Sequence, residues 1–464
     1  MTPPKKGSIA QKPPHPGVGG FAASKSRTQL PRILVMRDLV SLIIGTVIGS
    51  GIFLVPGSVL RPVGNSVVVA MIVWLTGGVL SLLGALTYGE LSAMQPEAGG
   101  LYVFIRDTFG PLLGFLYGWT LFFVISSGSV ATLAVAFSNY LSEFTSLSPW
   151  AAKLVSVLMI FVIAVVNVRG TRQSADLQNI TTAIKVSAIV VMSVVLLSFG
   201  KNPILSDPST GSTGHTGSLL PGFGLAMIGV LWAYEGWQYA TFSAGESINP
   251  QRDFPRAFLI GSAALIGIYL LANFGYLAAI GPEGVAGSNR VAMTAVAAVM
   301  GPRLAKLVGL TILVSIFSAA NSIILTAPRV YYAMARDGLF FKRLSEVHPR
   351  FGTPAFAVIS AAIWAAVLAS TGTFEQLLTY VIFIGWIFYA LAAASVFVYR
   401  KRAPDANRPY RVPGYPFTPI VFIAAAMVLV VNTIATQPGR SAVGLGIVCL
   451  GIPAYAIWRR IAKR

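Results

Sequence analysis

The stretch GTVIGSGIFLVP, from Gly45 to Pro56, decides the fold, because it interrupts a helix in the middle of an apolar segment. The whole segment, Arg37–Leu60, is long enough to cross a bilayer core, which needs about 20 mostly apolar residues. Unpaired backbone groups inside a bilayer cost several kcal/mol each unless they line a cavity or bind something. Gly49-Ser50-Gly51 therefore favours a ligand site, although Gly45-xxx-Gly49 is equally typical of two closely packed helices.

The rest of the chain has the composition of an integral membrane protein. Of its 464 residues, 55% are hydrophobic and 11% are charged, and the mean hydropathy is +0.73. Such values lie outside the usual soluble range and predict an all-α membrane protein with twelve spans. The expected spans are Arg37–Leu60, Ser66–Glu90, Leu112–Tyr140, Trp150–Val168, Leu177–Phe199, Gly222–Ala244, Phe258–Ile280, Leu304–Ala335, Ala355–Ser370, Leu377–Val398, Phe417–Ala435 and Ala442–Trp458.

The net charge of +19 is explained by topology. With a cytoplasmic N-terminus, 26 of the 34 Lys and Arg residues lie inside, 7 outside and 1 within a span. This is the positive-inside pattern of a multi-pass protein, here of the plasma membrane with both termini cytoplasmic. A nucleic-acid binder gathers its charge on one folded face, so no nucleic-acid partner is expected.

The domain organisation follows from the same spans. Residues 1–36 are expected to form a disordered cytoplasmic tail, since the first thirty are rich in Pro, Gly, Ser and Lys. Residues 37–400 are expected to form the main helical core, and 401–464 to hold two further helices and a short cytoplasmic C-terminus. The last two helices are assigned to packing or to contacts between two copies of the chain.

Patterns of catalysis and metal binding do not occur in the sequence. There is no HExxH, Walker or GxSxG motif, the three histidines are scattered, and Cys449 is the single cysteine. The chain is therefore not expected to be an enzyme, and neither a cofactor nor a metal ion is expected.

Two ionisable residues fall well inside expected spans, Lys185 and Glu235. A charge at a helix centre costs about 2.5–3.5 kcal/mol on insertion scales, so such residues usually face a polar interior. Alternatively, Lys185 extends its stem toward the cytoplasmic end of its span. Glu235 is either a residue at a wet helix break or a protonated carboxyl satisfied by a neighbouring helix.

A second interruption, GVLWAYEGW, lies near the middle of the sixth span. If the first ten spans form two five-helix halves, both interruptions lie at corresponding positions, which is typical of a transporter binding site. Free N–H groups after a break suit a carboxylate, and free carbonyls before it suit an ammonium. An amino acid carries both groups, so this pattern predicts an amino acid as the ligand. The N–H groups of Ser50, Gly51 and Ile52 are assigned to the carboxylate. The carbonyls assigned to the amine are those of Val47, Ile48, Trp232 and Ala233.

Four motifs in order resemble the L-amino acid transporter family of the amino acid, polyamine and organocation superfamily, over about Arg37 to Trp458. They are GTVIGSGIFLVP, PEAGGLYVFIRDTFGPLLGFLYGW, LWAYEGW followed by GESINPQRDFPRAF, and RPYRVPGYPFTP. The resemblance implies the inverted-repeat fold of the bacterial leucine transporter, with helices one to five at about 37–199 and six to ten at about 222–399. It also implies sodium-independent exchange of amino acids by alternating access.

The resemblance assigns roles residue by residue. The substrate-binding Gly-Ser-Gly segment matches Gly49, Ser50 and Gly51, and the aromatic gate matches Trp232. Lys185 matches a helix-five lysine whose ammonium replaces the sodium ion of sodium-coupled relatives. The side-chain pocket matches Tyr234, Glu235 and Gln238, and Tyr276 is expected to reach it from helix seven, ahead of Tyr269.

Two departures separate the chain from animal members of that family. Those members often have a small residue in place of Glu235, so a carboxyl here points toward small hydroxylated or cationic side chains, or adds a group that binds a proton. They also join an accessory glycoprotein through a cysteine, and Ser138–Trp150 contains none. No disulfide-linked accessory subunit is therefore expected.

The sequence thus predicts an exchanger of neutral L-amino acids. A proton-coupled symporter is the alternative, with Lys185 or Glu235 as the proton carrier. A cationic amino-acid carrier and an amino-acid sensor are further alternatives, but the short C-terminal segment RRIAKR offers no output domain.

Overall fold

The computed structural model describes residues 30–142, 144–203, 219–371 and 374–461, and these ranges are helical apart from turns and one isolated bridge. Nine of the helices described there are long and apolar enough to cross a membrane by length and composition. The fold is therefore all-α. The expected loop 201–220 and the first 29 residues of the expected tail lie largely or wholly outside the described residues.

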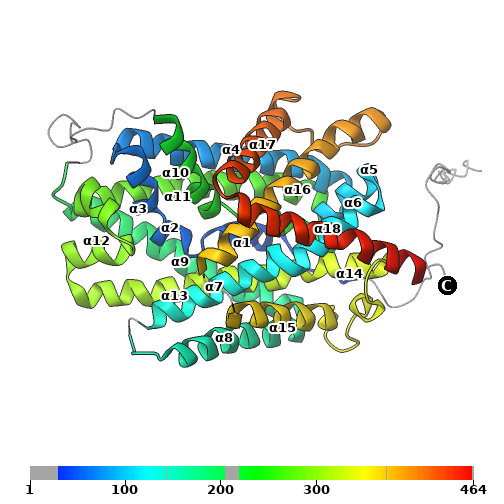
Figure 1. Ribbon diagram of the computed structural model, residues 1–464, viewed down its shortest axis with the longest axis horizontal. Coiled ribbons are helices and arrows are strands. Elements are labelled where there is room, and N and C mark those ends of the chain that lie inside the picture. Colours follow the sequence, from blue (N-terminus) through cyan, green and yellow to red (C-terminus); the bar gives the residue numbers. More distant parts are fainter. Residues whose placement is uncertain (1–29, 143, 204–218, 372–373, 462–464) are drawn as a thin grey trace, which may run out of the picture.

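Several of the long helices, such as α9, α11 and α13, run along the long axis of the molecule (Figure 1), whereas α17 crosses it. The first part contains α1 (Met36–Val47), α2 (Gly51–Leu54), α3 (Pro56–Leu60), η1 (Arg61–Val63), α4 (Val67–Met94), α5 (Leu101–Phe109), α6 (Pro111–Thr120), η2 (Leu121–Ile125), α7 (Ser126–Leu141), α8 (Pro149–Arg169) and α9 (Thr171–Phe199). Here η2 is a single π-helical turn between α6 and α7, so all three make one continuous span.

The second part of the chain is also helical. It contains α10 (Leu219–Ala233), η4 (Trp237–Glu246), α11 (Pro250–Gly287), α12 (Val291–Met300), α13 (Pro302–Thr326), α14 (Pro328–Arg336), η5 (Lys342–Ser345), α15 (Ala355–Thr371), α16 (Phe374–Arg402), α17 (Phe417–Thr436) and α18 (Pro438–Ile461). Each span expected from hydropathy overlaps one or more of these helices. Two helices outside those spans, α5 and α12, have only nine and ten residues, too few for a hydropathy window of span length to detect.

The first interruption is a true break in the helix. At Ile48 the backbone has φ −75° and ψ 86°, which is not helical, and the N–H of Gly49 turns back to the Val47 carbonyl at 2.9 Å. The second break, after Ala233, contains Gly236 with φ 125°. That left-handed conformation is open to glycine and strained for residues with a Cβ atom.

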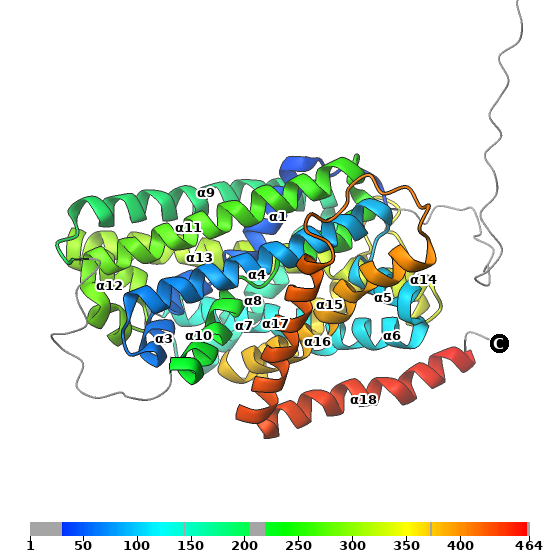
Figure 2. The ribbon, with the colours of Figure 1, turned by 90° about the horizontal axis from the view of Figure 1, so that it is seen from above.

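The broken helix α1 lies in the middle of the bundle (Figure 1). Helices α9, α11 and α13 pack against it, together with η4. By contrast, α18 runs along the edge of the bundle beside α17 and α6, as Figure 2 shows. The two breaks are thus placed in the interior, and the last two helices lie at the margin.

The last residues of the expected tail are part of the fold, which corrects the boundary at residue 36. Leu34 is fully buried and forms a bridge with Ser247 at the end of η4. The N–H groups of Ile33 and Leu34 both donate to the Glu246 carbonyl, at 2.8 and 2.9 Å. Tail composition did not reveal this contact because the apolar run Ile33–Met36 is short and follows a segment rich in Pro, Gly, Ser and Lys.

Candidate functional site

The two helix breaks touch each other. A Cβ atom added to Gly51 would lie 2.8 Å from the Cα of Ala233, and one added to Gly236 would lie 2.8 Å from Thr46 Cγ2. Tyr269 on α11 joins the two sides, because its hydroxyl is within hydrogen-bond distance of the Val47 carbonyl (3.1 Å) and the Ala233 carbonyl (2.8 Å). The interrupted segments therefore form a single structural unit.

The first break carries several hydrogen-bond donors that have no acceptor among the described residues. No backbone carbonyl in the described ranges accepts from the N–H groups of Ser50, Gly51 or Ile52. The Ser50 hydroxyl is also buried, and none of the described residues pairs with it. Unsatisfied buried donors are costly, so this segment has the chemistry of an anion site.

Most carbonyls of the first break already have partners. The Ile48 oxygen accepts from Lys185 Nζ (2.7 Å) and Ser315 Oγ (3.0 Å), and the Val47 oxygen accepts from Gly49 and Tyr269. Both expected amine ligands thus have their two lone pairs in use in this conformation. The Thr46 carbonyl, by contrast, accepts no hydrogen bond from the described residues.

Lys185 lies at the centre of the bundle, on α9. Its side chain is completely buried, and its ammonium donates to the carbonyls of Gly45 (2.6 Å) and Ile48 (2.7 Å). This burial excludes the alternative in which the stem extends to the cytoplasmic end. Ser315 on α13 also donates to Gly49 at 3.1 Å, so side chains of α9 and α13 hold the broken end of α1.

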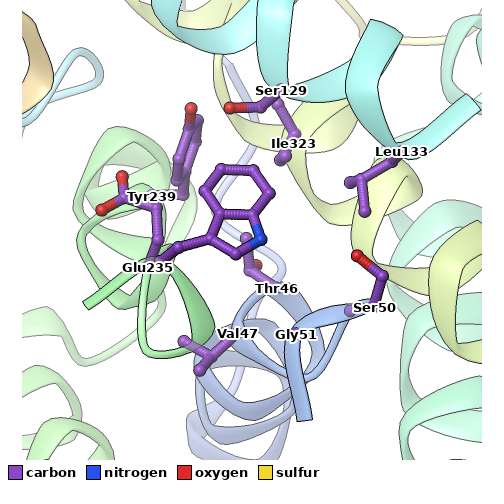
Figure 3. Close-up of a pocket in the computed structure, with 12 residues that line it drawn as sticks. Thr46, Val47, Ser50, Gly51, Ser129, Leu133, Glu235, Tyr239 and Ile323 are labelled. Carbon is purple, nitrogen blue, oxygen red and sulfur yellow. The ribbon is translucent and has the colours of Figure 1, made fainter. Parts of the chain in front are cut away.

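A small cavity opens where the breaks meet. Its lining residues are Thr46, Val47, Gly49, Ser50, Gly51, Ser129, Leu133, Trp232, Glu235, Gly236, Tyr239 and Ile323. Figure 3 shows Ser129 and Leu133 on one side and Thr46, Val47 and Gly51 on the other. The free N–H groups of Ser50 and Gly51 and the Ser50 hydroxyl therefore belong to residues of the cavity wall, and the third free N–H group belongs to the next residue, Ile52.

Glu235 reaches the cavity from the second break. One of its carboxylate oxygens, Oε1, lies 2.6 Å from Gln238 Nε2 and 2.5 Å from the Tyr389 hydroxyl of α16. Gln238 and Tyr389 also bond to each other, at 2.8 Å. Glu235 thus has features of both expected arrangements. It lines a cavity at a helix break, and it bonds to the neighbouring helix α16.

Several residues expected at the site stand behind the cavity wall. The residues outside the lining are Ile48, Lys185, Ala233, Ile52, Tyr234, Gln238 and Tyr276. Tyr234 turns its ring toward Trp74 and Tyr269, with centroids 6.1 and 4.8 Å away. Neither helix-seven tyrosine lines the cavity. Tyr269 bonds to a carbonyl of each break, and the role expected for Tyr276 stays a prediction.

Sequence reasoning missed part of the wall. Thr46, Gly236 and Tyr239 lie next to the two interruptions and were overlooked although they are in the same motifs. The other missed residues are Ser129 and Leu133 on α7 and Ile323 on α13. The one signal on α7 is the small polar run SSGS at 126–129, which is unusual in an apolar span and permits close approach.

The sequence of the chain matches one family of known proteins. Residues 34–452 match the family model described as amino acid permease. A serine/threonine exchanger of Bacillus subtilis is 33% identical over 89% of this chain and 94% of its own length. The human cystine/glutamate transporter is 32% identical over 94% of this chain and 86% of its own. The human large neutral amino acids transporter small subunit 2 is 30% identical over 95% and 84%.

These relatives are transporters and exchangers of amino acids, and none of them is named as an enzyme. The matched region begins at Leu34, two residues before α1, and ends within α18. It therefore includes both helix breaks and every residue of the cavity wall. The chain belongs to the amino acid permease family, as a multi-pass membrane protein of its L-amino acid transporter branch.

Proposed function

We propose that this protein exchanges neutral L-amino acids across the plasma membrane by alternating access and without a sodium ion. The observation that carries the proposal is the meeting of two helix breaks at one cavity, with free N–H groups on its wall. Paired broken spans are the expected place for a transporter's substrate. The similarity to amino-acid exchangers supports the same conclusion.

The substrate backbone binds the first break in this proposal. The α-carboxylate accepts from the N–H groups of Ser50, Gly51 and Ile52, aided by the unpartnered Ser50 hydroxyl. The α-ammonium takes the free Thr46 carbonyl, a better acceptor than Val47 or Ile48, whose oxygens already bond within the protein. The carbonyl of Trp232, a residue of the cavity wall at the second break, accepts one internal hydrogen bond and supplies a further ligand.

Lys185 takes the place of a coupling ion. Carbonyl oxygens of an unwound helix are the ligands with which sodium-coupled carriers bind their cation. Here the ammonium occupies two such oxygens, those of Gly45 and Ile48, so the positive charge is part of the chain. The exchanger then needs no sodium, and Trp232 on the cavity wall serves as the gate.

The proposed framework has twelve spans with a cytoplasmic N- and C-terminus. The five-plus-five repeat is supported by the order of the breaks, one at α1–α2 and one at α10–η4. Contacts between two copies through α17 and α18 are part of the same proposal, because their outer faces are rich in exposed apolar residues.

Uptake into liposomes tests the proposal. Purified protein is reconstituted, and uptake of labelled serine, alanine and leucine is compared between interiors filled with unlabelled amino acid and empty interiors, in buffers without sodium. Strong stimulation by the filled interior is the expected result. Equal uptake into empty liposomes that rises with an inward proton gradient would replace exchange by proton symport, and a requirement for sodium would refute the role of Lys185.

A further inference from the structure

Two short basic segments lie at the same end of the molecule. One is η5, which follows α14, and the other is the last turn of α18. Figures 1 and 2 both place α14 and the C-terminal end of α18 there. The basic residues of η5 are Lys342 and Arg343, and those of the last turn of α18 are Arg459 and Arg460. All four side chains are exposed.

Aromatic rings join the two segments. Phe341, directly before Lys342, packs edge-on against Trp458, directly before Arg459, with ring centroids 5.1 Å apart. The buried ring of Phe340 contacts the same indole, at 5.5 Å. Basic side chains therefore begin on both sides of one ring contact. We call the four basic residues, together with the rings of Phe341 and Trp458, the basic-aromatic patch.

The charges of the patch are not neutralised by the protein. Among the residues that the structure describes, no ion pair includes any of the four basic side chains. The acidic residues close to η5 in the chain do not supply one, because Asp337 bonds to Arg106 and Glu346 is exposed and also outside these pairs. The patch thus presents four positive charges to an anion.

Exposed apolar residues accompany these charges. Phe341 is 61% exposed, and Ile457 and Ile461 of α18 are 55% and 63% exposed. An indole and exposed apolar side chains at the end of an apolar span are typical of the boundary between acyl chains and lipid headgroups. In the proposed topology this is the cytoplasmic boundary, where anionic lipids attract Lys and Arg side chains.

A phospholipid with an anionic headgroup matches both halves of the patch. Its phosphate oxygens accept hydrogen bonds from guanidinium and ammonium groups, and its acyl chains cover Phe341 and Ile457. An acidic protein segment would pair with the charges, but it would have to displace lipid from the apolar residues beside them. The combined chemistry therefore favours a lipid over an acidic protein.

We propose that the basic-aromatic patch binds the headgroup of an anionic phospholipid from the cytoplasmic leaflet, with basic side chains of η5 and of α18 on the same headgroup. The choice of leaflet rests on the topology in the proposed function, whereas the binding itself does not depend on transport. A headgroup held from two elements loses affinity when either element is neutralised, and neutralising charges elsewhere on the same face has no such effect.

Lipid titrations followed by native mass spectrometry test this inference. The full-length protein, purified in an uncharged detergent, is titrated with phosphatidylglycerol or with phosphatidylcholine that has the same acyl chains. We expect the first bound phosphatidylglycerol to have a dissociation constant at least about 10-fold lower than that of phosphatidylcholine, because only its headgroup carries a net negative charge. The difference is expected to shrink as the salt concentration rises.

Two double variants locate the site. Lys342→Gln with Arg343→Gln removes the charges of η5, and Arg459→Gln with Arg460→Gln removes those of α18. Each pair is expected to weaken phosphatidylglycerol binding by about 10-fold or more, while phosphatidylcholine binding changes little. The four residues are exposed, and equal melting temperatures without added lipid would show that the variants fold as the unmodified protein does.

A third double variant is the matched control. Arg252→Gln with Arg256→Gln also removes two exposed charges, here from the start of α11, on the same side of the membrane in the proposed topology. The rings next to these arginines in the chain, Phe254 and Phe258, are buried, so this surface offers charge without exposed rings. Its phosphatidylglycerol affinity is expected to equal that of the unmodified protein.

Four results would overturn the inference. The first is equal affinity for the two lipids, and the second is unchanged phosphatidylglycerol binding in both patch variants. The third is the same loss of affinity in all three double variants, which would reflect the positive charge of the whole face. The fourth is full displacement of the lipid by an equal concentration of glycerol 1-phosphate, which would identify a site for a soluble phosphate. None of these results depends on amino-acid uptake, so failure of the proposed function would be seen separately.

Discussion

The guanidinium of Arg329 lies 2.6 Å from a carboxylate oxygen of Glu246, and both side chains are completely buried. Arg329 belongs to α14, and Glu246 is the last residue of η4. Thr171, at the start of α9, donates to the same carboxylate at 3.0 Å and accepts from Arg329 at 2.9 Å. Three helices are thus held together by one enclosed ion pair.

Removing either partner of this pair is expected to destabilise the protein severely. Glu246→Gln or Arg329→Met leaves a buried charge without compensation, which costs about 3–5 kcal/mol. The double variant removes both charges, so it is expected to lose less stability than the sum of the single variants. Apparent melting temperatures in detergent measure this, and strictly additive losses would contradict the coupling.

Lys185→Ala is expected to abolish exchange while amino-acid binding persists in part. The change removes two hydrogen bonds to the broken end of α1 without touching the cavity wall. Serine exchange in liposomes and serine binding to purified protein are measured side by side. Lys153→Ala, at an exposed position of α8, is the control, and full exchange by Lys185→Ala would refute the assigned role.

Gly51→Ala is expected to reduce the exchange rate by about 10-fold or more. The added methyl group would lie 2.8 Å from the Cα atom of Ala233, where no flexible side chain can yield, and overpacking of this kind costs about 1–3 kcal/mol. Gly267→Ala on α11 is the matched control, because no atom lies within 4 Å of its added methyl group. Equal rates in the two variants would show that the breaks separate freely.

Tyr269→Phe tests the bridge between the two breaks. The variant keeps the ring but takes away the partner of the buried Ala233 carbonyl, a loss of about 1–3 kcal/mol. A lower melting temperature and slower serine exchange are expected together. Tyr455→Phe, which removes the hydroxyl of a buried tyrosine of α18, is the control. A Tyr269→Phe protein with unchanged exchange would mean that the bridge is dispensable.

Local patterns revealed the helices and the first break well. Gly49 and Gly51 within an apolar run have an obvious physical consequence in a bilayer, because they interrupt a helix where no water can pair its backbone. Lys185 stood out for a similar reason, since a charged residue at mid-span needs polar partners. Each of these signals is contained in about ten consecutive residues.

The remainder of the site depends on distances between elements, which one sequence does not contain. Tyr269 and Tyr276 lie seven residues apart in the same apolar segment. Only the packing of α11 against α1 shows that Tyr269 is the one that bonds to the broken helix. Tyr389 lies 154 residues from Glu235, in a span with no interruption. Ser129 and Leu133 are ordinary residues for an apolar helix, and their place on the wall follows from how α7 meets the breaks.

The backbone hydrogen bonds before α1 connect the two broken helices. Ile33 and Leu34 donate to the Glu246 carbonyl, and Ile248 donates back to the Leu34 carbonyl at 2.9 Å, so the entry to α1 and the exit from η4 are tied. Tyr269 also joins the two segments, at the Val47 and Ala233 carbonyls, so we expect them to move together. A force on the N-terminal end of the chain is therefore transmitted to both halves of the binding site at once.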